Sequence, residues 1–208
     1  MRKITSIFFA FIAMGVCVHS AEIALFNGKD LKGWNFFLED SSVDAKSVFF
    51  VKDGLINILG KPFGYMYSDG LYDNFKLSFQ WRYPNKPSNS GVFIFVQEEN
   101  KIWPNAVEIQ LCAGKAGDFV LLGGSDLAEF KCSGPRPEFP VVARSMADVE
   151  NEIGKWNLGE IICKDGKVEV YINSVKVNEG SKPMFKKGRI AFQSEGDLIQ
   201  IRNIILSK

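Results

Sequence analysis

Short apolar segments that alternate with polar residues, each bounded by turn residues, dominate this sequence. Residues 48–59 contain two such segments around the turn sequence KDG, and residues 161–172 repeat the pattern around a second KDG. An Asp-Gly pair between two alternating segments predicts a β-hairpin. A third segment, residues 175–177, follows the second hairpin after the turn Asn173-Ser174. The pattern therefore predicts antiparallel strands that are joined by tight turns.

Further segments of the same kind follow between and after these hairpins: residues 75–83, 91–97, 106–112, 118–122, 189–194 and 198–206. A helical repeat is found only near residues 145–152, and it is short. Residues 134–140 contain three prolines, which predicts an extended surface loop because proline cannot occupy a central strand. About a dozen short strands with regular turns indicate an all-β antiparallel sandwich or barrel. No charge run or linker divides the chain, so we expect one domain.

Residues 1–20 have the pattern of a secretory signal peptide rather than of a transmembrane helix. A basic start precedes the apolar residues 7–18, and Val18-His19-Ser20 fits a cleavage site before Ala21. We therefore expect residues 21–208 to be exported to the periplasm, the cell surface or the medium, with no transmembrane segment. Lipid attachment at Cys17 is the less favoured alternative, because Val16 is not the small residue expected there.

The only histidine of the sequence is His19, which the signal peptide would remove. The remaining chain could then hold no Ser-His-Asp or Cys-His nucleophile and no HExxH zinc site. Any metal ion would be bound by oxygen ligands, which favours Ca²⁺, Mg²⁺ or Mn²⁺, and the sequence assigns no specific ligand set. Losing Arg2 and Lys3 from 25 basic residues leaves one fewer basic than the 24 acidic side chains. No nucleic-acid partner is expected, because no basic stretch interleaves with aromatic residues.

Three cysteines follow the signal peptide: Cys112, Cys132 and Cys163. No CxxC motif occurs, so neither a redox motif nor a zinc knuckle is present. Two interpretations stay open. Cys112 and Cys132 form a disulfide in an exported protein, or all three are small, partly buried thiols.

Alternation also predicts which side chains share a face of a strand. It places Gln80 and Arg82 opposite the apolar side chains of their segment, and it places Glu108 and Gln110 likewise. The segments near the C-terminus add a further glutamine and arginine at positions 193 and 202. If these faces coincide, they form one polar platform whose amides and guanidinium groups suit sugar hydroxyls. The alternative is the ordinary solvated face of an antiparallel sheet.

Six stretches in order resemble one known family: ALFNGKDLKGW (24–34), GYMYSDGLYDNFKLSFQWRY (64–83), NSGVFI (89–94), WPNAVEIQ (103–110), GKWN (154–157) and FQSEGDLIQIRNI (192–204). This is the 3-keto-disaccharide hydrolase domain family, and the resemblance spans nearly the whole chain after residue 20. It implies a concanavalin-A-like jelly-roll sandwich of two antiparallel sheets. It also implies action on a glycoside or oligosaccharide that is oxidised to a ketone at C3.

A C3 ketone changes what the site must supply. A conventional glycosidase needs two carboxyl groups, whereas here Glu108 is followed by Gln110 and Cys112. The ketone makes the C2 proton acidic, so the aglycone can leave by elimination with one base and an electrophile for the enolate oxygen. The resemblance thus suggests Glu108 as base or acid and Arg82 as the electrophile, whose role a divalent cation could share.

The remaining assignments concern a third catalytic residue and the substrate contacts. Glu195 is expected to serve as an acid or a metal ligand. The substrate-binding candidates are Gln80, Gln110, Asn89, Trp103, Gln193 and Arg202. Simpler interpretations stay open: Glu108 pairs with Arg82, Asn89-Ser90-Gly91 is only a turn, and Trp34 belongs to the core.

Four positions differ from the residue that is common in the family. Cys112 replaces an aspartate, Phe95 an arginine, Glu195 a histidine and Lys155 a glutamate. Two functions therefore stay open, a lyase or hydrolase of 3-keto-glycosides and a non-catalytic carbohydrate-binding protein. An ordinary glycosidase is disfavoured because the paired carboxylates are absent from the strand. The sequence indicates neither the aglycone nor the oligomeric state.

Overall fold

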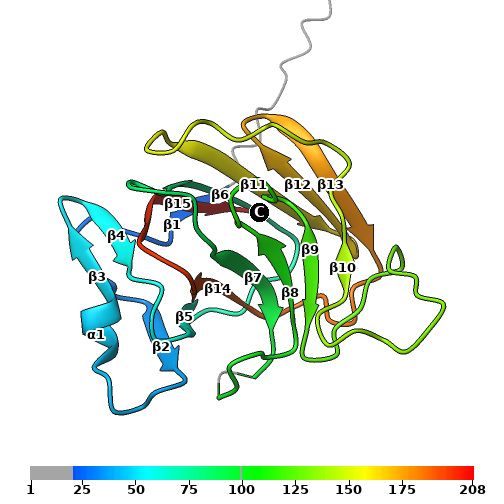
Figure 1. Ribbon diagram of the computed structural model, residues 1–208, viewed down its shortest axis with the longest axis horizontal. Coiled ribbons are helices and arrows are strands. Elements are labelled where there is room, and N and C mark those ends of the chain that lie inside the picture. The colour runs from blue at the N-terminus through cyan, green and yellow to red at the C-terminus, as the bar shows by residue number, and fades with distance from the viewer. Residues whose placement is uncertain (1–20, 99) are drawn as a thin grey trace, which may run out of the picture.

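The computed structural model describes residues 21–98 and 100–208. The prediction of a signal peptide and the alternative of a lipid at Cys17 concern residues 1–20, which lie outside the described residues. The described chain forms two antiparallel sheets that pack as two layers (Figure 1). The expected jelly-roll sandwich is therefore confirmed.

Each sheet is built from strands that are distant in sequence. The first, sheet A, has the neighbour order β13 (Val175–Ser181), β12 (Lys167–Ile172), β11 (Asn157–Lys164), β6 (Phe75–Arg82), β15 (Ile199–Ser207), β4 (Leu55–Ile58) and β3 (Phe49–Lys52), and β1 (Glu22–Ala24) pairs with β15. The second, sheet B, has the order β10 (Val141–Val142), β9 (Phe119–Leu122), β8 (Ala106–Gln110), β7 (Gly91–Val96), β14 (Arg189–Ser194), β5 (Gly64–Ser68) and β2 (Trp34–Leu38).

Every segment that the alternation marked is a strand, and both KDG turns join hairpins, β3–β4 and β11–β12. Four strands were not predicted. β1 and β10 are too short to show a repeat, and β2 and β5 carry apolar or aromatic side chains on both faces. Residues 134–139 are exposed and lie outside any strand, as expected.

The helix expected near residues 145–152 is wrong, since this stretch is irregular. The one α-helix among the described residues is instead the single turn α1 (Ala45–Val48), which Asp44 caps by accepting a hydrogen bond from the Lys46 amide. The apolar residues in 145–152 are few, and the segment is held by side-chain contacts of Arg144 and Glu150 rather than by helical packing. No helix in the described part of the chain is long and apolar enough to span a bilayer.

The cysteines are free in the structure. Cys112 is half-buried, Cys132 is exposed and Cys163 is buried. The interpretation that pairs Cys112 with Cys132 is therefore wrong, and the alternative of three partly buried thiols is correct for Cys112 and Cys163 but not for the exposed Cys132. Burial raises the pKa of the Cys163 thiol, which lies in the apolar core as a small side chain.

The main core lies between the sheets and is rich in aromatic rings. Phe79 of sheet A meets Phe192 of sheet B edge to face, with ring centroids 5.5 Å apart, and Trp34 packs against Phe192 at 5.8 Å. Trp34 is 6% exposed and donates its indole N–H to the Leu25 carbonyl. Trp34 is thus a core residue, as its simpler interpretation held.

A second, smaller apolar cluster covers part of the outer face of sheet B. It consists of Tyr65, Phe93, Val96, Ala106, Val120, Leu122 and Ala191, with Trp103 packed against it. The Tyr65 hydroxyl donates to the Lys101 carbonyl at 2.9 Å, which ties the segment before β8 over this face. Sheet B therefore carries apolar side chains on both faces where this cluster lies.

The contact between the sheets should dominate stability. Replacing Phe192 with alanine should lower the free energy of unfolding by about 3–5 kcal/mol, because the ring is fully buried and leaves a cavity. Leu71→Ala is the control, since Leu71 is 55% exposed and should change that free energy by less than about 0.5 kcal/mol. Urea unfolding measures both. Equal effects of the two substitutions would contradict this packing.

Candidate functional site

The polar side chains do not form one platform. Glu108, Gln110 and Gln193 lie on sheet B, whereas Gln80, Arg82 and Arg202 lie on sheet A, each group on strands whose alternate residues fill the core. The two groups therefore occupy opposite outer faces of the sandwich. The expectation of a shared platform is wrong, because alternation fixes the face of a strand and not the sheet that the strand joins.

Arg82 is bound within sheet A. Its Nε donates to Gln200 Oε1 at 2.9 Å, and its guanidinium lies 4.6 Å from the ring centroid of Trp156. The ion pair between Arg82 and Glu108 is therefore absent. Arg82 is also not placed to stabilise negative charge on a substrate that contacts Glu108. The expectation that Arg82 acts as the electrophile beside Glu108 is therefore wrong.

Glu108 lies in the middle of β8 and is only 3% exposed. Its side chain extends over Gly91 of the neighbouring strand β7. A Cβ atom at position 91 would meet Glu108 Oε1 at 2.1 Å. Gly91 is the first residue of β7, and its lack of a side chain leaves the space that the Glu108 carboxyl group occupies. The interpretation of Asn89-Ser90-Gly91 as only a turn is therefore incomplete.

The buried carboxyl group of Glu108 lacks a donor. Its Oε1 atom has no hydrogen-bond partner among the described residues. Burial raises the pKa of Glu108 to about 8, and the negative charge of Glu195 contributes to the rise. Glu108 is thus mainly protonated at neutral pH and is ready to donate a proton or a hydrogen bond.

Glu195 supplies a second carboxyl group from the loop that follows a different strand. It follows β14 directly and is partly buried. Burial raises the pKa of Glu195 above its usual value, and hydrogen bonds from the side chains of Asn89 and Gln193 reduce this rise only in part. These amides favour the ionised form, so the two carboxyl groups have different environments. The sequence of β8 contains only one carboxyl group of the expected pair, and the fold brings Glu195 near it as the second.

Two amide oxygens at the same place also lack partners. Asn89 Oδ1 and Gln193 Oε1 are buried without a hydrogen bond from any described residue, as is Glu108 Oε1. Three acceptors without donors are costly to bury, and hydroxyl groups of a ligand would satisfy them. We refer to Glu108, Glu195, Asn89 and Gln193 as the carboxyl site.

Two loops hold the carboxyl site by backbone contacts. Ser90 Oγ donates to the Gln193 carbonyl at 2.8 Å, and the Asp197 amide donates to Ser88 Oγ at 2.7 Å. Gly196 has a φ of 76°, and a Cβ there would lie 2.4 Å from Ser88 Oγ. The loop before β7 and the loop after β14 therefore meet only because residue 196 is glycine.

Gln110 has a mainly structural contact. Its Oε1 accepts hydrogen bonds from the backbone amides of Leu111 at 3.0 Å and Cys112 at 2.9 Å. Only the Nε2 group of Gln110 remains for a ligand. Gln110 could therefore donate a hydrogen bond to a sugar hydroxyl but not accept one through Oε1. Burial raises the pKa of the half-buried Cys112 thiol, and the charges of Glu150 and Glu195 contribute.

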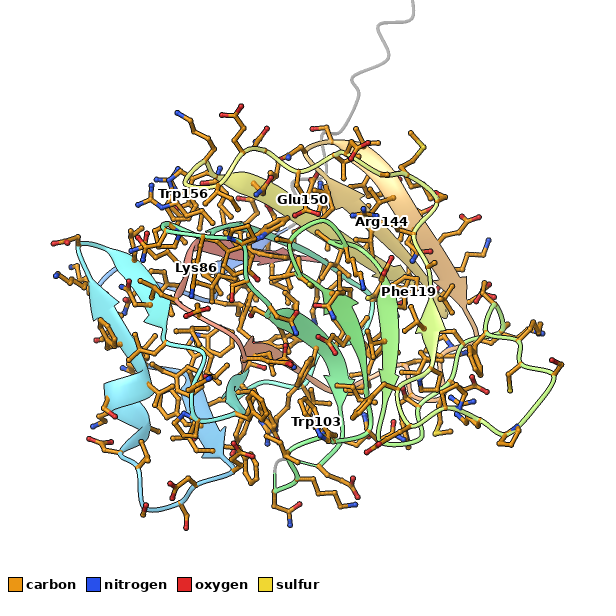
Figure 2. The ribbon with its side chains drawn as sticks, viewed as in Figure 1. Lys86, Trp103, Phe119, Arg144, Glu150 and Trp156 are labelled. Atoms are coloured by element: carbon orange, nitrogen blue, oxygen red, sulfur yellow. The ribbon has the colours of Figure 1, made fainter. Side chains whose placement is uncertain are left out.

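Trp103 packs against the apolar cluster on the outer face of sheet B, the face that Glu108 also occupies, and Figure 2 shows it at the opposite end of the view from Glu150. It packs edge to face against Phe139 at 5.5 Å and against Phe63 at 6.4 Å. The structure thus gives Trp103 a packing role, and its contact with a ligand stays a prediction.

The four departures from the family pattern separate in space. Phe95 is 4% exposed and packs against Phe75 in the core, and Lys155 is exposed beside Trp156. Neither belongs to the carboxyl site. Cys112 and Glu195 do lie at or beside it, since the charge of Glu195 acts on both Glu108 and Cys112. Two of the four replacements therefore concern the site chemistry.

A metal site receives limited support. Within residues 21–98 and 100–208, no group of three His, Cys, Asp or Glu side chains is placed to hold a metal ion. The carboxyl site offers two carboxyl groups and two amide oxygens, which suit a hard cation in type. A divalent cation thus stays a prediction.

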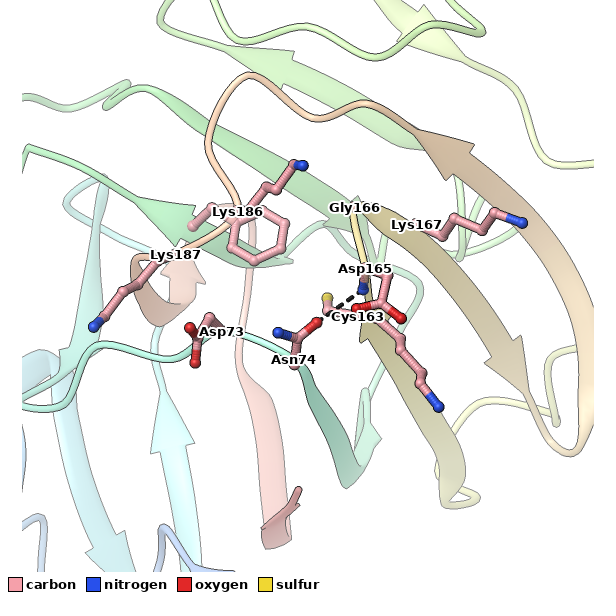
Figure 3. A pocket seen from close by; sticks show the side chains of 10 residues that line it. Asp73, Asn74, Cys163, Asp165, Gly166, Lys167, Lys186 and Lys187 are labelled. Carbon is pink, nitrogen blue, oxygen red and sulfur yellow. Dashed lines mark hydrogen bonds between the residues drawn. The ribbon is translucent and has the colours of Figure 1, made fainter.

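A pocket of about 390 Å³ lies elsewhere, beside the β11–β12 hairpin (Figure 3). Asn74 accepts a hydrogen bond from the Asp165 amide at 2.8 Å on its floor. The pocket is lined by four lysines, but Figure 3 shows Lys167, Lys186 and Lys187 pointing in different directions, away from a common centre. None of the predicted site residues lines this pocket, and its polar side chains do not point toward a common centre where a ligand could bind.

Comparisons with known proteins agree with this fold. The family model described as a 3-keto-alpha-glucoside-1,2-lyase-like domain matches residues 21–207. A candidate glycosyl hydrolase from Parabacteroides distasonis is 23% identical with a TM-score of 0.65, and the match covers 89% of this chain and 93% of that one. No curated protein matches the sequence.

Two more distant structures share the fold. A carbohydrate-binding module from Bacillus subtilis is 7% identical with a TM-score of 0.60, covering 85% of this chain and 96% of its own. LamA from Zobellia galactanivorans, in complex with laminaritriose and laminaritetraose, is 12% identical with a TM-score of 0.58, covering 85% and 92%. At these identities the likeness shows the sandwich alone.

The contact between Gly91 and Glu108 can be tested by stability. Gly91→Ala should lower the free energy of unfolding by about 1–3 kcal/mol, because the added methyl group displaces the buried carboxyl. In a Glu108→Ala background most of this loss should disappear. Gly134→Ala is the matched control, since nothing lies within 4 Å of its Cβ position. Urea unfolding measures the free energy of unfolding of the four variants. If Gly91→Ala lowers this free energy as much without Glu108 as with it, the contact between residues 91 and 108 is contradicted.

Proposed function

The chain belongs to the 3-keto-alpha-glucoside-1,2-lyase-like family and is a carbohydrate-active domain, and on that premise we propose that it cleaves 3-keto-glycosides by elimination. The observation that carries the proposal is the carboxyl site, where the buried Glu108, whose Oε1 has no hydrogen-bond partner among the described residues, lies near Glu195, which receives hydrogen bonds from two amides. We assign Glu108 as the donor of a proton or hydrogen bond and Glu195 as the base.

Glu195 is the proposed base. Its carboxylate takes the proton from C2 of the keto sugar, and the electron pair moves toward the C3 oxygen to form an enolate. The enolate then expels the aglycone from C1, and the C1–O bond breaks. The proton passes from Glu195 to the departing aglycone oxygen, which regenerates the carboxylate. Water added to the resulting enone completes a hydrolysis.

Glu108 is the proposed electrophile in place of Arg82. A protonated carboxyl group can donate a hydrogen bond to the C3 oxygen as negative charge develops there. Burial strengthens that bond because the surroundings screen charge weakly. The unpartnered oxygens of Asn89 and Gln193 would accept from sugar hydroxyls, and Gln110 Nε2 would donate to one.

Sugar binding without bond cleavage is the second candidate function. It is favoured by the replacement of the family's histidine and aspartate by Glu195 and Cys112 beside the unpartnered acceptors of the carboxyl site. The fold likeness to a carbohydrate-binding module is compatible with this alternative. Binding that persists without any release of aglycone would establish it.

Substrate oxidation state separates these functions. Mature protein, from Ala21 onward, should release aglycone from a 3-keto-glucoside and leave the matched native glucoside intact, because only the ketone makes the C2 proton acidic. Mass spectrometry of the released aglycone measures both. Cleavage of the native glucoside would instead establish an ordinary glycosidase, and release from neither would contradict the proposed enzyme.

The two carboxyl groups should differ in their pH dependence. Because the pKa of Glu108 is raised to about 8 and its protonated form is the active one, kcat/KM should fall as the pH rises above that value. Glu108→Gln keeps a hydrogen-bond donor, so it should retain part of the activity and lose the alkaline fall. Glu195→Gln should reduce kcat by more than about 10²-fold, since it removes the base. A retained alkaline fall in Glu108→Gln would contradict the assignment.

A requirement for Ca²⁺, Mg²⁺ or Mn²⁺ is tested by the same assay after chelation and re-addition of each ion. Activity that survives chelation would show that the carboxyl site works without a cation. Export also stays a proposal, and amino-terminal sequencing of protein from the periplasmic fraction tests it. A chain that starts at Ala21 is expected, whereas a retained Met1 would contradict cleavage of residues 1–20.

A further inference from the structure

Two arginines meet at one tryptophan on the outer face of sheet A. The guanidinium carbon of Arg202 lies 4.0 Å from the ring centroid of Trp156, and that of Arg82 lies 4.6 Å from it. Trp156 directly precedes β11 and lies at the edge of the sandwich beyond Lys86 (Figure 2). We refer to Arg82, Arg202 and Trp156 as the arginine pair site.

Glutamine side chains fix both guanidinium groups. Arg202 Nε donates to Gln80 Oε1 at 2.8 Å, and Arg82 Nε donates to Gln200 Oε1 at 2.9 Å. Gln80 and Gln200 belong to adjacent strands, which makes the arrangement reciprocal. Each arginine is thus held through its inner nitrogen. The outer nitrogens stay available, apart from a 3.4 Å contact of Arg82 with the Gly154 carbonyl.

No described carboxylate neutralises this pair. Among the described residues, neither Arg82 nor Arg202 forms an ion pair. Glu160, on the same face of β11, is bound to Lys76 at 2.6 Å. Two like charges that are held around one ring repel each other, and an anion that bridges them would remove this repulsion.

We propose that the arginine pair site binds the oxyanion of an acidic saccharide, namely the carboxylate of a uronic acid or a sulfate ester. Guanidinium groups hold both oxyanions through paired N–H donors, and two fixed forks offer such pairs from two sides. The site lies on the outer face opposite the carboxyl site, so it binds a separate part of a saccharide or a separate chain. It does not depend on catalysis at Glu108.

Isothermal titration of the full mature protein tests the proposal with three probes: a glucuronic-acid oligosaccharide, a neutral oligosaccharide of equal length, and sodium sulfate. The acidic oligosaccharide should bind, and its affinity should fall as the salt concentration rises. Arg202→Gln should weaken this binding by at least about tenfold, because it removes one charged fork. Arg202→Lys should weaken it also, since lysine keeps the charge and loses the fork.

Arg136→Gln is the matched control. Arg136 also stacks on an aromatic ring, at 4.8 Å from the Phe130 centroid, but it lies in a distant loop and pairs with Asp126. It should leave binding unchanged, because it removes a guanidinium group outside the arginine pair site. Thermal unfolding of each variant confirms folding. Should Arg202→Gln fail to fold, Arg202→Lys and Arg82→Lys carry the test.

Three outcomes would overturn the arginine pair site as a site for an oxyanion, and a fourth would overturn the saccharide as its ligand. The first is equal binding of the acidic and neutral oligosaccharides. The second is binding by the arginine variants that equals that of the unmodified protein. The third is a loss of binding in Arg136→Gln that is as large as the loss in Arg202→Gln. If sulfate alone binds as tightly as the acidic oligosaccharide, the saccharide is overturned as the ligand and a free oxyanion takes its place.

Discussion

The burial of Glu108 over Gly91 is the constraint on which the candidate site depends. Sheet B has the core on one face and an apolar cluster over part of the other, so a carboxyl group in the middle of β8 finds little water and no donor. A carboxyl group in such a place holds its proton up to a high pH. The lack of a side chain at position 91 gives it the space to lie there.

The proposed acid and base come from β8 and from the residue that follows β14, two segments that only the fold brings together. Glu108 is buried and keeps its proton, whereas Glu195 is partly exposed and receives hydrogen bonds from two amides. Conventional glycosidases of this sandwich carry both carboxyl groups on one strand, and this chain does not. The second group is that of Glu195, directly after β14, at a position where the family commonly has a histidine. We propose that the protonated carboxyl group of Glu108, rather than Arg82, acts as the electrophile.

The alternation of residues predicted most of the fold, because burial on one face leaves a repeat of two in the sequence. It predicted β6, β8 and β15 and the outward direction of Arg82 and Glu108. It could not predict which sheet each strand joins, since this depends on pairing between distant segments, and so it merged two opposite faces into one platform. It also missed β2 and β5, whose side chains are apolar on both faces. The space at Gly91 was visible only as a glycine next to a turn.

The most direct test concerns the protonation of Glu108 itself. Protein labelled with ¹³C at the glutamate carboxyl groups can be followed by NMR as the pH is raised, with Glu108→Gln to assign the signal. The account predicts one glutamate that is still protonated at neutral pH, that titrates near pH 8, and that is absent from the variant. Titration of every glutamate near the ordinary carboxyl pKa would contradict it.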